Sequence, residues 1–161
     1  MWKHVARNLP KKKLSMNKLL TIGLLFSALF IRGCGVARAE VSEIVLQTIA
    51  MEAADQPLAG QIAVAHVILN RARIGHISPQ EAVLRPKHFS CWTSPKWAKT
   101  WLEAHYTPKT RQNALSALNK AIGGSRNNLT HYHHVSIKPY WAKGHTPRLV
   151  IWNHAFYEGI N

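Results

Sequence analysis

Acidic residues are scarce in this sequence, which contains seven Asp and Glu residues against 21 Lys and Arg residues. Eight of the basic residues precede Glu40, whereas every acid lies at or after it. The chain from Glu40 onward therefore has 13 basic and seven acidic residues, and its net charge is +6 rather than the +14 of the whole sequence. This moderate excess suits an anionic partner such as a cell-wall polymer, a membrane surface or a nucleic acid, without selecting among them.

Long hydrophobic runs are also few. The longest mostly apolar run, residues 19–31, follows a lysine-rich segment and is shorter than the ~20 residues that a transmembrane helix needs. Ala37-Arg38-Ala39 then provides the small-x-small pattern of a signal-peptide cleavage site. We therefore predict a signal peptide over residues 1–39 and one globular domain over residues 40–161, exported to the periplasm, the cell wall or the extracellular space. An uncleaved membrane anchor is the alternative.

Cysteine is almost absent, which limits both disulfide bonding and covalent anchoring. Cys34 lies within the predicted signal peptide, so Cys91 would remain alone and the mature domain would have no intramolecular disulfide. The residues before Cys34 loosely resemble a lipoprotein cleavage box, but Arg32 is unfavourable there, so lipidation is the lesser alternative. Met16 is a second possible start, which would give the signal peptide a more ordinary length.

Three segments have the apolar periodicity of helices, namely residues 40–55, 58–74 and 108–122. The middle of 58–74 has few polar positions, so we expect this helix to be the most buried. Ser78-Pro79-Gln80-Glu81 is a capping box with Pro at the first helical position, and it opens a short helix. Glu81 thereby has a structural role and is removed from the candidate catalytic acids. Residues 88–101, rich in aromatic side chains, are predicted to form a connection.

The last third of the sequence changes character. Residues 130–134 and 148–152 are short, β-prone and bounded by turn residues. The sequence has no internal repeat and no low-complexity tract. These features predict an α+β fold, in which a helical part packs on a small antiparallel sheet.

Glu52 is the acid with the most distinctive surroundings. It lies in a run of small and apolar residues, with Ile49-Ala50-Met51 before it and Ala53-Ala54 after it. A carboxyl group in apolar surroundings keeps its proton more readily, because desolvation penalises the charged form. A general acid needs that property at neutral pH. The structural alternative is an ordinary Glu on the surface of a helix.

Several sequence blocks, taken in order over residues 44–157, resemble the cell wall hydrolases of the spore-cortex-lytic SleB/CwlJ type. The blocks are Glu52-Ala-Ala, Gly60-Gln-Ile-Ala-Val-Ala, Asn70-Arg71, Phe89-Ser-Cys91, Thr130-His-Tyr-His, Trp141-Ala and His154-Ala-Phe-Tyr157. The resemblance implies a lysozyme-like or lytic-transglycosylase-like α+β domain that cuts the glycan strand of peptidoglycan without a cofactor. The bond cut would be the β-1,4 bond between N-acetylmuramic acid and N-acetylglucosamine.

The resemblance also implies that Glu52 is the catalytic acid, because it opens the family's E-A-R-G-E-like motif. The later residues of that motif differ here, where Ala54, Asp55 and Gln56 replace its Arg, Gly and second Glu. Asp55 lies on the same side of the helix as Glu52 and is poorly placed to act on the opposite face of a sugar. Glu103 and Glu158 have no distinctive surroundings. A single acid suffices in a lytic transglycosylase, where a hydroxyl of the sugar attacks and one Glu serves first as acid and then as base.

Supporting residues are expected in a groove between the helical part and the sheet. Thr130 is a candidate for hydrogen bonding to a sugar, and Tyr132 and Trp141 have flat rings suited to sugar faces. Asn70-Arg71, at the end of the buried helix, is predicted to have a structural role in binding loop carbonyls. Export argues against a nucleic-acid partner. We expect a monomer that contacts peptidoglycan strands and meets a membrane only through its signal segment.

Two alternatives belong to other functional classes. The histidines of the last third, at positions 131, 133, 134, 145 and 154, could supply ligands for zinc in a wall amidase or peptidase. However, the sequence has no His-Glu-x-x-His motif and no Cys pair at zinc spacing, so we predict no metal site. The second alternative is a non-catalytic wall-binding module that uses the positive charge and the aromatic side chains.

Overall fold

The computed structural model of the protein describes residues 42–160, and the predicted signal peptide with its cleavage site and Cys34 lies outside them. Helices occupy the first two-thirds of this range and strands the last third. The helices are α2 (Glu43–Ala53), α3 (Leu58–Gly75), α4 (Pro79–Leu84), α5 (Pro95–His105) and α6 (Pro108–Gly123), with short 3-10 helices η1 (Ser90–Trp92) and η2 (Tyr140–Ala142). The strands are β1 (Leu129–His134), β2 (Leu149–Ile151) and β3 (His154–Glu158). The predicted α+β fold class is confirmed.

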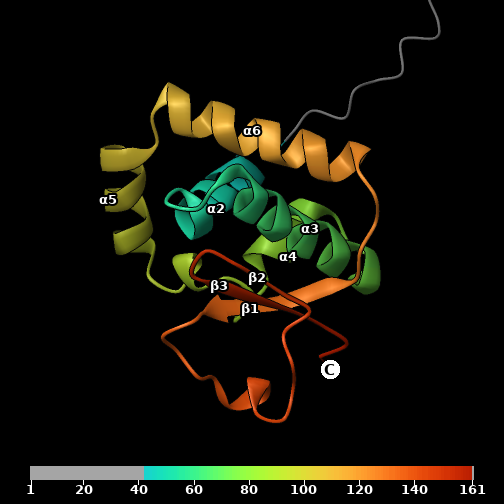
Figure 1. Ribbon diagram of the computed structural model, residues 1–161. Coiled ribbons are helices and arrows are strands. Elements are labelled where there is room, and N and C mark those ends of the chain that lie inside the picture. The colour runs from blue at the N-terminus through green and yellow to red at the C-terminus, as the bar shows by residue number, and fades with distance from the viewer. Residues whose placement is uncertain (1–41, 161) are drawn as a thin grey trace, which may run out of the picture. The chain divides into compact units, whose positions relative to one another are not determined.

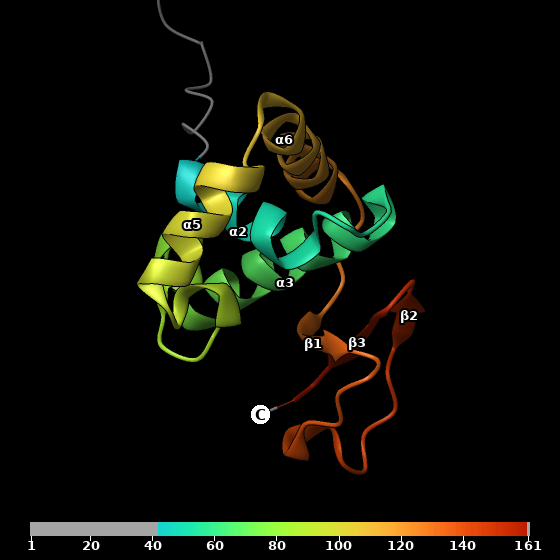
Figure 2. The ribbon, with the colours of Figure 1, turned by 90° about the vertical axis from the view of Figure 1, so that its left-hand side faces the viewer.

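The hydrophobic core is centred on α3. Figures 1 and 2 show α6 on one side of α2 and α3, and the small sheet on the other. Val64, Val67 and Ile68 of α3 are fully buried, and so are Leu46 and Ile49 of α2. The prediction that residues 58–74 form a central buried helix is therefore confirmed. Among residues 42–160, no helix combines the length and the apolar character needed to cross a membrane.

Three of the helices begin with the same local signal, a Ser or Thr followed by Pro. Ser78, Ser94 and Thr107 each accept a hydrogen bond from the backbone N–H three residues later, and Pro follows each of them at the first helical position. Such caps satisfy amide groups that the first turn of a helix leaves unpaired. The capping box predicted at Ser78 is confirmed. The connection predicted over residues 88–101 is wrong in its second half, because the Ser94 cap starts helix α5 there.

The sheet has three antiparallel strands in the order β1-β3-β2. Phe156 in the central strand pairs with Tyr132 of β1 on one side and with Leu149 of β2 on the other. The pairing of β1 with β3 shifts register between Leu129 and His131, so Thr130 lies at an irregularity. The strands predicted at 130–134 and 148–152 are confirmed as β1 and β2, whereas β3 was not predicted. Residues His154 to Tyr157 of β3 are all buried, so this strand lacks the alternation that marks a half-exposed one.

Candidate active site

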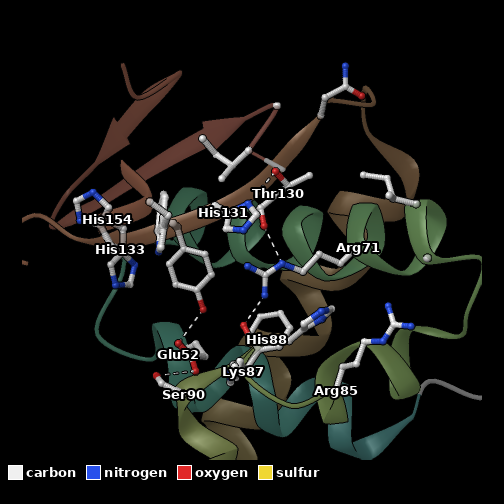
Figure 3. A pocket seen from close by; sticks show the side chains of 18 of the residues that line it. Glu52, Arg71, Arg85, Lys87, His88, Ser90, Thr130, His131, His133 and His154 are labelled. Atoms are coloured by element: carbon white, nitrogen blue, oxygen red, sulfur yellow. Dashed lines mark hydrogen bonds between the residues drawn. The ribbon is translucent and has the colours of Figure 1, made fainter. Parts of the chain in front are cut away.

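A cavity of about 960 Å³ lies between the helical part and the sheet. Its lining includes Glu52 from α2, Arg71 from α3 and residues of β1, and Figure 3 shows several of these side chains directed toward a common space. Glu52 also lines a smaller hollow of about 270 Å³, together with Met51, Cys91 and Trp97 among others. Glu52 and Ser90 line both hollows. The two hollows therefore meet at Glu52 and Ser90.

The carboxylate of Glu52 is held by donors from two distant segments. Its Oε1 accepts a hydrogen bond from the backbone N–H of Cys91 at 3.1 Å, and the Ser90 hydroxyl lies 3.5 Å from the same oxygen. Its Oε2 accepts a hydrogen bond from the Tyr132 hydroxyl at 2.7 Å. The prediction that apolar groups surround Glu52 is therefore wrong at the carboxylate itself. Of its apolar neighbours along the helix, Ile49, Ala50 and Ala53 instead face the core, where they are buried.

Helix η1 is fastened to α2 at two places. The indole N–H of Trp92 donates to the Thr48 hydroxyl at 3.0 Å, and that hydroxyl donates to the backbone carbonyl of Ile44 at 2.7 Å. Thr48 precedes Glu52 by one helical turn, so the two anchoring points lie on one face of α2. The Trp92 contact therefore holds η1 where the Cys91 N–H meets the Glu52 carboxylate.

The ring of Tyr132 is fixed by neighbours in the sheet. Its centroid lies 5.5 Å from that of Phe156 and 5.3 Å from that of His154. Burial raises the pKa of the Tyr132 hydroxyl well above its usual value, and the adjacent Glu52 charge raises it further. Tyr132 therefore stays protonated and serves as a hydrogen-bond donor to Glu52. The thiol of Cys91 likewise keeps its proton, because burial and then the Glu52 charge raise its pKa.

Arg71 connects the segments that bring these donors to Glu52. Its Nε donates to the backbone carbonyl of Thr130 at 2.7 Å, its Nη1 donates to the carbonyl of His88, and its guanidinium lies 4.9 Å from the centre of the Phe89 ring. One side chain of α3 thus ties β1 to the segment that leads into η1. Asn70 makes a similar contact with the carbonyl of Leu129 at 2.9 Å. The predicted structural role of Asn70-Arg71 in binding backbone carbonyls is confirmed, although the carbonyls of Leu129 and Thr130 belong to strand β1 and only that of His88 to a loop.

Among the described residues, Glu52 is the only acid that lines the large cavity. The side chain of Asp55 accepts a hydrogen bond from Gln56, Glu103 pairs with Lys99 on α5, and Glu158 pairs with Arg148. The structure therefore brings none of the other three acids considered from the sequence to face Glu52 across the cavity.

The three candidates for sugar binding line the same cavity as Glu52. Thr130 is buried at the irregular point of β1, and its hydroxyl lies 3.1 Å from Nδ1 of His131. The ring of Trp141, on η2, lies 5.1 Å from His131 and 5.3 Å from Tyr157, measured between centroids. Tyr132 also donates a hydrogen bond to the Glu52 carboxylate, a contact that was not part of its predicted role in sugar binding.

Some of the residues around Glu52 were not recognised as such from the sequence. Ser90 and Cys91 belong to a block that marked the family resemblance, but nothing in the block indicates that a backbone N–H of Cys91 points at Glu52. Arg71 was recognised only as a helix-end residue. The available signal was the occurrence of these residues in the same ordered set of blocks, which does not specify a contact.

The histidines lie near one another without forming a metal centre. Within residues 42–160, no three His, Cys, Asp or Glu side chains come together in a way that could hold a metal ion. His133 uses both ring nitrogens in hydrogen bonds, with the Tyr157 hydroxyl at 2.9 Å and the His134 carbonyl at 2.8 Å. Nothing in this geometry favours the zinc alternative.

Comparison with known proteins identifies the family. The model of the cell wall hydrolase family matches residues 55–157. The chain belongs to the cell wall hydrolase family. The match begins three residues after Glu52 and so does not include it. Among solved structures, the chain is similar to the catalytic domain of the Bacillus cereus SleB protein, with 19% identity over 76% of this chain and 98% of the other and a TM-score of 0.49.

A search of curated proteins gave no match. The predicted SleB/CwlJ-type family is confirmed by the family match, and membership supports an enzyme that acts on the peptidoglycan of the cell wall. Such an activity is consistent with a location outside the cytoplasmic membrane or in the wall.

Proposed function

We propose that this cell wall hydrolase cleaves the glycan strand of peptidoglycan, at the β-1,4 bond between N-acetylmuramic acid and N-acetylglucosamine, with Glu52 as the general acid and base. The observation that carries the proposal is the position of Glu52 as the only acid among the described residues that line the cavity. Glycosidic cleavage requires a proton donor at the leaving oxygen, and a carboxyl group is the usual donor.

In the first step, protonated Glu52 gives its proton to the glycosidic oxygen while the bond from that oxygen to the anomeric carbon breaks. In the second step, a hydroxyl of the same sugar attacks the anomeric carbon and Glu52 takes up the hydroxyl proton, which yields an anhydro sugar. The proton lost by Glu52 in the first step is regained in the second, so one carboxyl group completes the cycle. Hydrolysis by an inverting or retaining route would need a second carboxylate, and no other acid among the described residues lines the cavity.

The donors around Glu52 suit this cycle, because the carboxylate is charged between the two steps. The Cys91 N–H and the Tyr132 hydroxyl both direct hydrogens at its oxygens. Hydrogen bonds to a charged acceptor are stronger than those to a neutral one, so these donors stabilise the ionised intermediate form. We assign to both residues the role of holding the carboxylate in position.

The glycan is proposed to pass over Glu52 from one hollow to the other, because Glu52 lines both. Thr130, Tyr132 and Trp141 would contact sugars in the larger cavity. The positive domain would act as an exported monomer, with residues 1–39 as its signal peptide.

The test is mass spectrometry of the fragments released from peptidoglycan by the purified protein and by its Glu52→Gln variant. The matched control is Glu103→Gln, since Glu103 is exposed and pairs only with Lys99 on its own helix. We expect anhydro-muramyl ends that disappear with Glu52→Gln and persist with Glu103→Gln. Ordinary reducing ends would mean that water attacks, and undiminished release by Glu52→Gln would refute the role of this residue.

Two additional measurements separate the alternatives. Binding of Glu52→Gln to insoluble peptidoglycan is measured by co-sedimentation, and retained binding without cleavage supports a catalytic acid. If the unaltered protein binds and releases no fragment, the wall-binding module is correct. Release of peptides in place of sugars, abolished by a chelator, would support the zinc alternative.

A further inference from the structure

The cavity that contains Glu52 is also lined by several cationic side chains. Arg73 from α3, together with Arg85 and Lys87 from the segment after α4, lines the cavity in addition to Arg71. In Figure 3, Arg85 lies at the far end of the view from Glu52, and the Arg71 guanidinium lies between them. One acid and four permanent cations thus share one cavity among the residues that the structure describes.

None of these cations forms a salt bridge within the described part of the chain, although Arg85 lies near Glu81, whose pKa is lowered by hydrogen bonds from Ser78 and also by the Arg85 charge. The ion pairs found between residues 42 and 160 are Lys99 with Glu103, Arg111 with Glu43, and Arg148 with Glu158. Arg73, Arg85 and Lys87 are exposed at the cavity, and Arg73 makes one side-chain contact, with the Asn128 side chain at 3.4 Å. A ligand that binds Arg73, Arg85 and Lys87 would therefore displace no salt bridge among the described residues.

Two histidines of the cavity, His88 and His131, add little to this charge at neutral pH. Burial lowers the pKa of His131 to about 4, with a further contribution from the Arg71 charge. Burial also lowers the pKa of His88, and again Arg71 adds to the effect. The Arg and Lys side chains of the cavity suit carboxylate groups as ligands.

The sugar rings of a peptidoglycan strand are neutral, but the muramic acid residue next to the proposed cleavage point has a peptide attached to it. Such peptides have carboxylate groups, at a short covalent distance from the bond that Glu52 would cut. An anionic group on the same molecule, close to the reacting bond, is what a cavity lined by both Glu52 and cations would accommodate.

We propose that Arg73, Arg85 and Lys87 form a subsite for the peptide carboxylates of the strand, so that the enzyme selects peptide-substituted, anionic glycan over neutral glycan. This inference rests on the proposed function and specifies its substrate class. Arg73 and Arg85 can each bind a carboxylate with two parallel hydrogen bonds, and Lys87 acts as a point charge. Phosphate groups of another wall polymer would bind the same cations by related chemistry. The experiment therefore distinguishes peptide carboxylates from phosphates as the bound anion.

The first arm of the experiment changes the substrate and leaves the protein intact. Peptidoglycan is compared with the same material after its peptide carboxylates have been converted to neutral amides, and with material from which phosphate polymers have been removed. We expect KM to rise about tenfold on the amidated material, because contacts of exposed charges are individually modest, while kcat changes little. Removal of phosphate should leave KM unchanged.

The second arm changes the protein. The triple variant Arg73→Gln, Arg85→Gln, Lys87→Gln is compared with Lys120→Gln, a single exposed cation on α6 outside the cavity. On native peptidoglycan, we expect the triple variant to have the same raised KM that the unaltered protein has on amidated material. On amidated material, the KM of the triple variant should rise no further. The Lys120→Gln control should behave as the unaltered protein does. The sensitivity of KM to salt should also fall in the triple variant.

Three results would overturn the proposal. The first is an unchanged KM of the unaltered protein on amidated peptidoglycan. The second is an equal rise in KM for the triple variant on native and on amidated material. The third is a raised KM of the unaltered protein after removal of phosphate. To separate this proposal from the role of Glu52, the same comparisons are made by co-sedimentation of Glu52→Gln, which reports binding in the absence of cleavage. If Glu52→Gln binds native and amidated peptidoglycan equally well, the subsite is refuted. If Glu52→Gln still cleaves peptidoglycan, only the catalytic role of Glu52 is refuted.

Discussion

The hydrogen bond from Tyr132 to Glu52 should contribute measurably to stability. Tyr132→Phe removes the hydroxyl that lies 2.7 Å from Oε2 of Glu52 and keeps the ring that packs on Phe156 and His154. Hydrogen bonds to a charged acceptor contribute about 1.5–3 kcal/mol to the free energy of unfolding. For a domain of this size, a loss of that magnitude lowers Tm by roughly 6–12 °C.

A double-mutant cycle with Glu52→Gln assigns this energy to the pair. In the Gln background the acceptor is neutral, so the same Tyr132→Phe change should cost only about 0.5–1.5 kcal/mol. We therefore expect the two changes to be non-additive, with a coupling of about 1–1.5 kcal/mol, which exceeds the ~0.3–0.5 kcal/mol found for independent sites. The cycle isolates the contact between the two side chains from any general effect of either change.

The assay is urea unfolding at neutral pH, followed by tryptophan fluorescence, for the four proteins of the cycle. The control is Tyr140→Phe, because Tyr140 is 90% exposed and loss of its hydroxyl should change stability by less than about 0.5 kcal/mol. If the effects of Tyr132→Phe and Glu52→Gln simply add, or if Tyr140→Phe costs as much as Tyr132→Phe, the hydrogen bond does not hold the carboxylate and the reasoning is refuted.

Two other predictions concern packing and pH. In Gly60→Ala, the new Cβ would lie 2.9 Å from Cβ of Gln56, so we expect the free energy of unfolding in urea to fall by about 1–3 kcal/mol. In the control Gly123→Ala, the new Cβ has nothing within 4 Å, so stability should be unchanged or slightly higher. Equal effects of the two changes would contradict this packing. Burial lowers the pKa of His131 from 6.5 to about 4 on folding, so the folded state binds fewer protons between these values. Its stabilising effect is complete above pH 6.5 and is lost as pH falls toward 4, by about 1–2 kcal/mol after allowance for solvent screening at this partly exposed ring. His131→Gln should remove this dependence, and parallel curves of stability against pH for the two proteins would show that another group is responsible.

Local sequence signals predicted most of the helical part. The periodicity of residues 58–74 depends only on which side chains occur along the chain, and the helix it predicts is the buried α3. The cap at Ser78 also acts over four consecutive residues and was predicted correctly. The same Ser-Pro signal precedes α5 at Ser94. The helix was nevertheless predicted as a connection, because the residues that follow Ser94 are rich in aromatic side chains. Strand β3 was missed because it is buried along its length and has no alternating pattern.

The sequence by itself predicted the helices other than α5, the fold class and the family, and it singled out Glu52 among seven acids as the candidate catalytic residue. Tertiary structure alone decided what surrounds the Glu52 carboxylate, because the Cys91 N–H and the Tyr132 hydroxyl lie 39 and 80 residues further along the chain. Side-chain periodicity is a local property, whereas a hydrogen bond between distant segments depends on how α2, η1 and β1 pack around α3. The same packing gathers Arg73, Arg85 and Lys87 on one cavity with Glu52, and turns a dispersed excess of positive charge into a candidate binding site.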